Sequence, residues 1–120
     1  MYLPQVTRHA SDLRDDHDDW SPGVYSWLQA WYAAQSNGDW EHQYGIEIGT
    51  LDNPGWSVQI DVTDTPLAGR DLPKLETYRT EHDWAVVWAD GAAFHGACGP
   101  MNLGEVLHHF RLWAGDISAR

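Results

Sequence analysis

The chain has 120 residues, of which 42% are hydrophobic and 12% aromatic, and it contains eight tryptophans. This length fits one compact domain, because domains typically have roughly 100 to 150 residues, and the apolar content excludes a wholly disordered chain. Eighteen acidic residues against seven lysines and arginines give a formal net charge of -11 at pH 7. That charge disfavours binding to nucleic acids and to anionic membranes, and it would attract a basic protein.

The cysteine content and the N-terminal segment indicate in which cellular compartment the protein is expected. The single cysteine, Cys98, excludes an internal disulfide and is consistent with a reducing cytoplasm. No apolar run is long enough to span a membrane, and the N-terminal segment is acidic where a secretory signal would be basic. Residues 1–22 show no apolar period. We therefore expect them to be a flexible acidic tail, and residues 23–120 to form a single domain.

Residues 24–36 carry the apolar spacing of an amphipathic helix. The positions i, i+3, i+4 and i+7 are occupied by Val24, Trp27, Leu28 and Trp31. The pair Ser21-Pro22 is typical of a helix start, with Ser21 at the N-cap. The pair Asn37-Gly38 is typical of a helix end, because both residues tolerate the left-handed conformation.

Two segments with alternating apolar and polar residues predict a β-hairpin. Strands over residues 44–48 and 56–62 would flank the turn sequence Asp52-Asn53-Pro54-Gly55. The polar face of this hairpin would carry Glu47, Gln59 and Asp61.

The second half of the chain predicts a loop, further strands and a closing helix. Residues 63–73 read as a loop and residues 75–78 as a weak strand, whereas 84–89 and 92–96 predict a hairpin around Asp90-Gly91. The apolar stripe over 103–114 predicts a helix, and Asn102 with Glu105 resembles a capping box.

The order of these elements predicts an α+β fold. No helix separates the strands, so we expect an antiparallel sheet, a hairpin meander of four or five strands. The N-terminal and C-terminal helices would pack on one face of this sheet and leave the other face open to solvent or a partner. We expect the function to lie on that open face.

Several strings in the chain are distinctive. They are W-L-Q-A-W-Y at 27–32, D-W-E-H-Q-Y-G-I at 39–46 and T-L-D-N-P-G-W at 50–56. Together with Asp83-Trp84, Gly99-Pro100 and the closing helix from Asn102 to Trp113, they resemble the immunity protein 53 family of bacterial polymorphic-toxin systems over residues 24–114. The resemblance implies a cytoplasmic protein that binds and neutralises a toxin encoded beside it, and it carries over no catalytic residues.

The densest group of candidate binding residues lies where the first helix gives way to the first strand. Tryptophan and tyrosine are favoured interface anchors, and a loop on a rigid scaffold is a common binding site. We expect a basic toxin as the partner, for example a nuclease. The residues predicted to contact it are Asp39, Trp40, Glu41, His42, Tyr44, Glu47 and Asp61. The structural alternative is that Trp40 and Tyr44 belong to the core and that Glu41 caps a turn.

The rival hypothesis is a small metal-dependent or acid/base hydrolase built around Glu41, His42 and Asp61. The histidine spacings do not favour a metal site, since no H-E-x-x-H motif occurs and His108 and His109 would point about 100° apart on a helix. A lone Cys98 without an evident histidine partner is typical of a small buried hydrophobe. We therefore predict a binding protein that is not an enzyme, with no cofactor, metal or catalytic residue.

Overall fold

The structure is a computed structural model that describes residues 23–115. The predicted tail over residues 1–22 lies outside these described residues. The elements in chain order are the helices α2 (Val24–Gln35) and α3 (Trp40–Gln43), the strands β1 (Ile46–Leu51), β2 (Gly55–Asp61), β3 (Asp71–Thr80), β4 (Asp83–Asp90) and β5 (Ala93–Cys98), and the helix α4 (Leu103–Ala114). This composition confirms the predicted α+β class with five antiparallel strands and two terminal helices.

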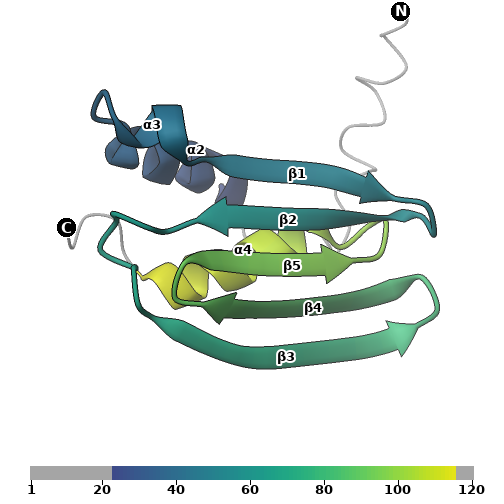
Figure 1. Ribbon diagram of the computed structural model, residues 1–120. Helices are drawn as coiled ribbons and strands as arrows, with labels where there is room; N and C mark the ends of the chain where they lie inside the picture. Colours follow the sequence, from purple (N-terminus) through teal and green to yellow (C-terminus); the bar gives the residue numbers. More distant parts are fainter. Residues whose placement is uncertain (1–22, 116–120) are drawn as a thin grey trace, which may run out of the picture.

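The five strands form one antiparallel sheet in the order β1-β2-β5-β4-β3 (Figure 1). The chain makes the β1-β2 hairpin, crosses to the far edge for β3, and returns through β4 to β5, which pairs with β2. The order therefore departs from a simple meander at one step, because β5 and not β3 lies beside β2. As a result β1 and β3 are the two edge strands.

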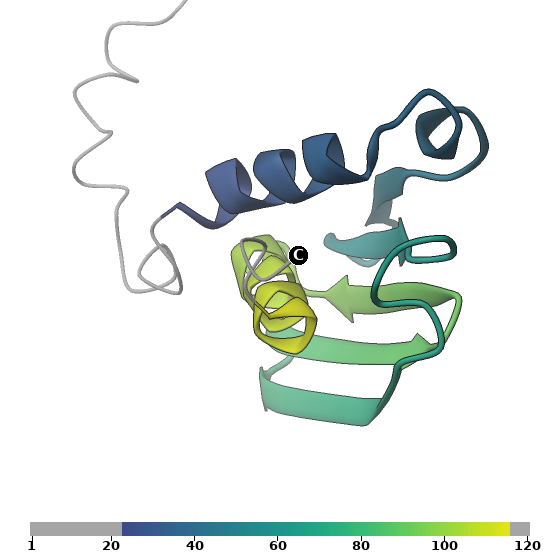
Figure 2. The same cartoon turned by 90° about the vertical axis from the view of Figure 1, so that its left-hand side faces the viewer.

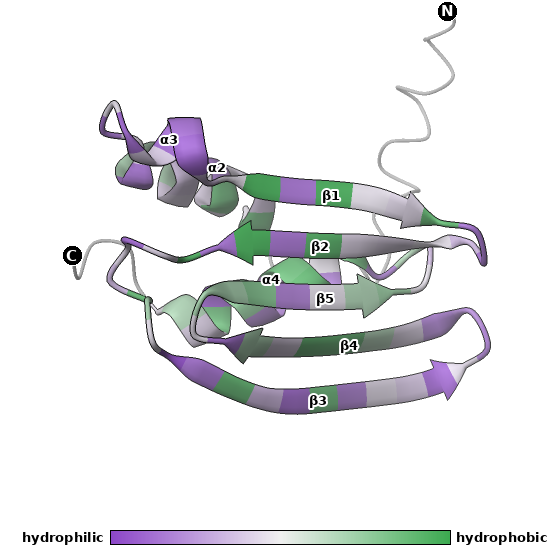
Figure 3. Ribbon diagram, in the orientation of Figure 1, coloured by the Kyte–Doolittle hydropathy of each residue, from purple (hydrophilic) through white to green (hydrophobic). Residues whose placement is uncertain are grey.

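Alternation of side chains between the two sheet faces explains why β1 and β2 form as predicted. Figure 3 shows apolar and polar residues alternating along both strands. Their register places Ile46 opposite Ile60 and Glu47 opposite Gln59, so apolar pairs share one face and polar pairs the other. The turn between the strands is the predicted D-N-P segment at 52–54.

Both long helices pack on the same face of the sheet (Figure 2). The α4 helix contacts β4 and β5, and α2 packs mainly on α4. Trp31 of α2 meets Phe110 of α4 edge to face, with ring centroids 5.0 Å apart, and both rings are buried. Close packing on the sheet requires Gly96, since a Cβ there would lie 2.5 Å from Val106 Cγ1. The core therefore lies between one sheet face and the helices.

The ends of the first helix differ from the prediction. The helix begins at Val24 and its N-cap is Gly23 at φ 87°, whereas the predicted N-cap, Ser21, lies outside the described residues. It ends at Gln35, and Ser36 leaves it with extended backbone, so Asn37-Gly38 is not its C-cap. Instead these two residues lead into the short α3 helix, because Asn37 Oδ1 accepts the N–H of Trp40 at 3.0 Å.

The third strand is longer than predicted. It starts at Asp71 and runs to Thr80, so it takes up the end of the expected loop 63–73. The sequence signal was weak because the strand is mostly exposed and contains Pro73, and its pairing with β4 is irregular between Leu72 and Leu75. An edge strand can tolerate proline and irregular pairing because one side of its backbone has no partner strand.

Candidate functional site

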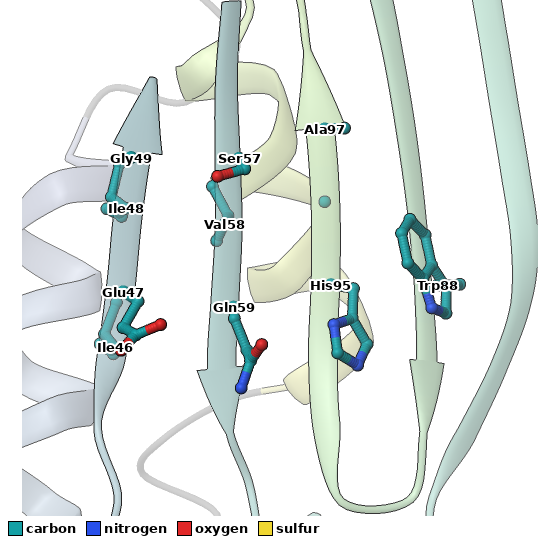
Figure 4. A pocket seen from close by; sticks show the side chains of 11 residues that line it. Ile46, Glu47, Ile48, Gly49, Ser57, Val58, Gln59, Trp88, His95 and Ala97 are labelled. Carbon is teal, nitrogen blue, oxygen red and sulfur yellow. The ribbon is translucent and has the colours of Figure 1, made fainter. Parts of the chain in front are cut away.

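The sheet face opposite the helices is the candidate site. Its side chains form a row across four strands, because Glu47, Gln59, His95 and Trp88 are successive cross-strand neighbours. The neighbouring row on the same face, two residues further along each strand, consists of smaller residues, namely Gly49, Ser57, Ala97 and Val86. Figure 4 shows the first row with its side chains standing on the sheet and the short side chains of Ser57 and Ala97 beside it.

These two rows create a shallow hollow of about 700 Å³ on the open face. Gly49, Ser57 and Ala97 contribute its floor, and Glu47, His95 and Trp88 also line it. The hollow exists because the floor residues are small where neighbouring positions carry large side chains. Gly49 has no side chain to fill this floor, and its nearest neighbour there is Ser57 Oγ, 3.5 Å from where a Cβ would lie.

An aromatic group occupies the β4-β5 side of the hollow. The rings of Trp88 and His95 stack with centroids 5.1 Å apart and planes 15° from parallel. Lys74 Nζ lies 5.1 Å from the centre of the Trp88 ring, and His95 Nε2 lies 3.1 Å from Asp90 Oδ2. The N–H groups of Ala92 and Ala93, and then His95, lower the pKa of Asp90 below its ordinary value of 3.8. Trp88 and His95 are thus held in place while remaining partly exposed.

A second aromatic pair lies on the same face. Tyr78 stacks on Trp84 with ring centroids 6.3 Å apart, and Tyr78 is 65% exposed. Glu76 accepts a hydrogen bond from the Tyr78 hydroxyl and raises its pKa. Sequence reasoning missed Trp88, His95 and Tyr78 as site residues. The alternation in β4, with Trp84 and Trp88 out of phase with Ala85, Val87 and Ala89, was the signal that separates them from the core.

The structure brings two of the predicted site residues together on the open face. Glu47 is exposed, and Asp61 is partly buried at the end of β2. Gln59 lies between them, opposite Glu47 in register and with its Nε2 3.4 Å from Asp61 Oδ1. Asp61 also accepts the N–H of Gly45 through Oδ2 at 3.0 Å, which ties the start of β1 to the end of β2. Asp61 therefore has a structural task in addition to its charge.

The segment 39–44 contains a short helix and not the open loop expected. Glu41 accepts the N–H groups of Asn37 and Gly38 at 2.9 and 2.7 Å, which closes the turn before α3. Its own N–H contributes most, and those of Asn37 and Gly38 further, to lowering the pKa of the carboxyl group. Glu41 has the turn-capping function that was the structural alternative in the sequence.

Trp40 is a core residue and is not available as a surface anchor. It is 3% exposed, its Nε1 donates to the Thr63 carbonyl at 3.0 Å, and its ring meets Trp31 edge to face. Tyr44 is partly buried beside it, with ring centroids 6.3 Å apart. Of the predicted group in this segment, Asp39 and His42 remain exposed. The sequence could not distinguish Trp40 from a surface anchor, because a tryptophan suits either environment.

Asp83 and Asn102, which belong to the distinctive strings of the sequence, have structural functions at the start of α4. Arg79 forms an ion pair with Asp83 and with the buried carboxylate of Glu105. Asn102 Nδ2 donates to Asp83 Oδ1 at 2.8 Å and to Glu105 Oε1 at 3.0 Å. The predicted capping box is therefore wrong, since the Asn102 side chain makes no cap hydrogen bond and binds two carboxylates.

The pair Gly99-Pro100 is explained by close packing at the same place. A Cβ on Gly99 would lie 2.3 Å from the His82 carbonyl oxygen, so only glycine fits. The Pro100 carbonyl accepts the Nε1 hydrogen of Trp56 at 3.0 Å. These residues secure the junction between β5 and α4 and do not line the hollow.

Residues 25–115 match the family described as immunity protein 53. The chain belongs to the immunity protein 53 family. The match spans most of the chain and confirms the resemblance seen in the sequence. A search of curated proteins and a search of solved structures each found no match.

The geometry gives little support to the rival hydrolase. Glu41, His42 and Asp61 do not line the hollow on the open face, and the two carboxylates bind different backbone segments. Within residues 23–115, no three histidine, cysteine or acidic side chains gather closely enough to hold a metal ion. Cys98 is fully buried, and burial raises the pKa of its thiol to about 12, which keeps it protonated and unreactive.

No helix within residues 23–115 combines the length and apolarity of a membrane span.

Proposed function

We propose that this immunity protein neutralises a cognate bacterial toxin by direct stoichiometric binding in the cytoplasm, and that it is not an enzyme. The proposed binding surface is the open sheet face. The observation that carries the proposal is the hollow beside the partly exposed Trp88 and His95, on a face that neither helix covers. Partly exposed aromatic side chains beside a depression are typical anchors of protein interfaces.

The charge of this face supports a basic partner. Among the described residues, its strands carry the carboxylates of Glu47, Asp61, Glu76 and Asp90 and the ammonium group of Lys74. The chain as a whole has a formal net charge of -11. A basic toxin, such as a nuclease that must bind phosphate, would be steered to this face by long-range attraction.

Filling the hollow tests the proposed surface. Ala97→Trp should place a large ring on the floor of the hollow without entering the core, and we expect at least a 100-fold loss of affinity for the toxin encoded by the neighbouring gene. Leu112→Trp is the matched control, because Leu112 is 64% exposed on α4, away from the open face. Affinity is measured by surface plasmon resonance with an inactivated toxin, and folding by circular dichroism. Full binding by a folded Ala97→Trp variant would place the interface elsewhere.

A pair of charge reversals tests the steering. Glu47→Lys on the open face and Glu81→Lys in the β3-β4 turn change the net charge equally. We expect Glu47→Lys to slow association about tenfold at low salt and to weaken its salt dependence, whereas Glu81→Lys should have a much smaller effect. Equal effects of the two reversals would show that net charge acts alone and that the open face is not the contact.

A further inference from the structure

The two edge strands of the sheet differ in how they are protected. The β3 edge contains Pro73 and Lys74 and pairs irregularly with β4, and these features discourage the addition of another strand. The β1 edge has none of them, because its sequence I-E-I-G-T-L contains no proline or lysine and its pairing with β2 is regular over six residues. The β1 strand is therefore the edge that can accept another strand.

The register of β1 identifies the backbone groups that are open for pairing. Asp61 donates its N–H to the Gly45 carbonyl at 3.0 Å, which makes Gly45 and Asp61 a hydrogen-bonded pair. In antiparallel pairing such pairs alternate with pairs that point their backbone groups away from each other. Counting along β1 from Gly45, every second residue therefore has its N–H and C=O groups directed away from β2. These residues are Ile46, Ile48 and Thr50.

The surface beside this edge is apolar and uncharged. The helix α2 has the sequence V-Y-S-W-L-Q-A-W-Y-A-A-Q, with no charged residue, although the chain is strongly acidic. A groove of about 400 Å³ lies between α2 and the start of β1, and Leu28, Tyr32 and Ile46 line it. Tyr32 is 40% exposed and Ile48 is 41% exposed on the helix side of the sheet. Depletion of charge with exposed tyrosine is typical of the core of a protein interface.

We propose that β1 accepts an extended strand of the toxin, so that the sheet gains a sixth strand. Alternate side chains of that strand would be apolar and would lie over Ile48 and in the groove beside α2. The side chains between them would point to the open face, where Glu47 favours lysine or arginine. This inference rests on the proposed function and specifies how the toxin is recognised, since backbone hydrogen bonds would supply affinity and the alternating pockets specificity.

The charge of the chain argues against a second copy as the occupant. Two copies would each bring a net charge of -11, and pairing of β1 with itself would add no basic group beside Glu47. A basic strand would instead be attracted to the acidic chain. The strand of a basic toxin is therefore the better partner for this edge.

Amide hydrogen exchange measured by NMR tests the inference on the unmodified protein. In the free protein, the amides of Ile46, Ile48 and Thr50 should exchange fast and those of Glu47 and Gly49 slowly. In the complex with the inactivated toxin from the neighbouring gene, we expect the three fast amides to slow by at least 100-fold. A complex in which all three stay fast would overturn the inference while leaving the proposed function standing. Failure to form any complex would instead contradict the proposed function.

Two substitutions provide an independent test. Thr50→Pro removes one outward N–H without removing a bond to β2, and we expect it to weaken toxin binding at least tenfold with little change in melting temperature. The mirror control is Pro73→Thr, which restores an N–H on the β3 edge and should leave toxin binding unchanged. If Thr50→Pro binds normally, or if light scattering and slow Ile48 exchange reveal a dimer of the free protein paired through β1, the toxin strand is not the occupant.

Discussion

Aromatic side chains on the two sides of the sheet have different functions. On the covered face, Trp31 and Phe110 are buried against each other and form the centre of the core. On the open face, Trp88 and His95 stack on each other but remain partly exposed. Burial of both faces of an aromatic ring makes it a stability determinant, whereas partial exposure leaves surface for a partner. In this tryptophan-rich chain, a ring between the helices and the sheet contributes to stability, whereas a ring on the open face is available to a partner.

A matched pair of substitutions tests this comparison most directly. Trp31→Ala should lower the free energy of unfolding by about 3–5 kcal/mol, because it removes a large buried ring and leaves a cavity. Trp88→Ala should cost less than about 1.5 kcal/mol, since the ring is already partly exposed, but it should weaken toxin binding. Urea unfolding followed by circular dichroism measures both. Equal losses of stability would contradict the assignment of the two faces.

The buried ion pair on the covered side should have the next largest effect. Arg79→Ala leaves the carboxylate of Glu105, which is 2% exposed, without its guanidinium partner. We expect a loss of about 2 kcal/mol, below the usual cost of breaking a buried pair because Arg79 itself is 38% exposed. Adding Glu105→Gln should recover part of the loss, because the buried charge is then removed. A double variant as unstable as Arg79→Ala would show that the charge is not the cause.

A substitution in the β4-β5 turn, beside the open face, should have the smallest effect on the free energy of unfolding. Asp90→Ala removes the acceptor for the N–H groups of Ala92 and Ala93 and should cost about 1 kcal/mol at pH 7. The folded pKa of Asp90 is below the ordinary value of 3.8, so its contribution is present above that pH and is lost as the pH falls through the folded pKa. In unfolding curves, the difference in stability between the parent and the variant should therefore shrink as the pH falls below 3.8. A difference that persists unchanged at low pH would exclude the carboxylate as the source.

The candidate site was only partly predictable from the sequence. The alternation in residues 44–48 and 56–62 placed Glu47 and Asp61 on the open face correctly, because side-chain direction in a strand follows from period 2 alone. The same reasoning failed for Trp40 and Glu41, which lie in an irregular segment without a period. There, the hydrogen bonds from Asn37 and Gly38 decided the conformation. Their geometry depends on the φ of 97° at Gly38, which no apolar pattern encodes.

The sequence by itself determined the α+β class, the two long helices, both hairpins and the membership in the immunity protein 53 family. These features follow from local periodicity, turn residues and distinctive strings, which a linear chain displays directly. Only the tertiary structure decided that β5 pairs with β2, which leaves β1 and β3 as the edges and assembles the hollow from four strands, β1, β2, β5 and β4. The physical reason is that strand order depends on long-range pairing and on the packing of α4 against β4 and β5, and neither leaves a periodic signal in the neighbouring residues.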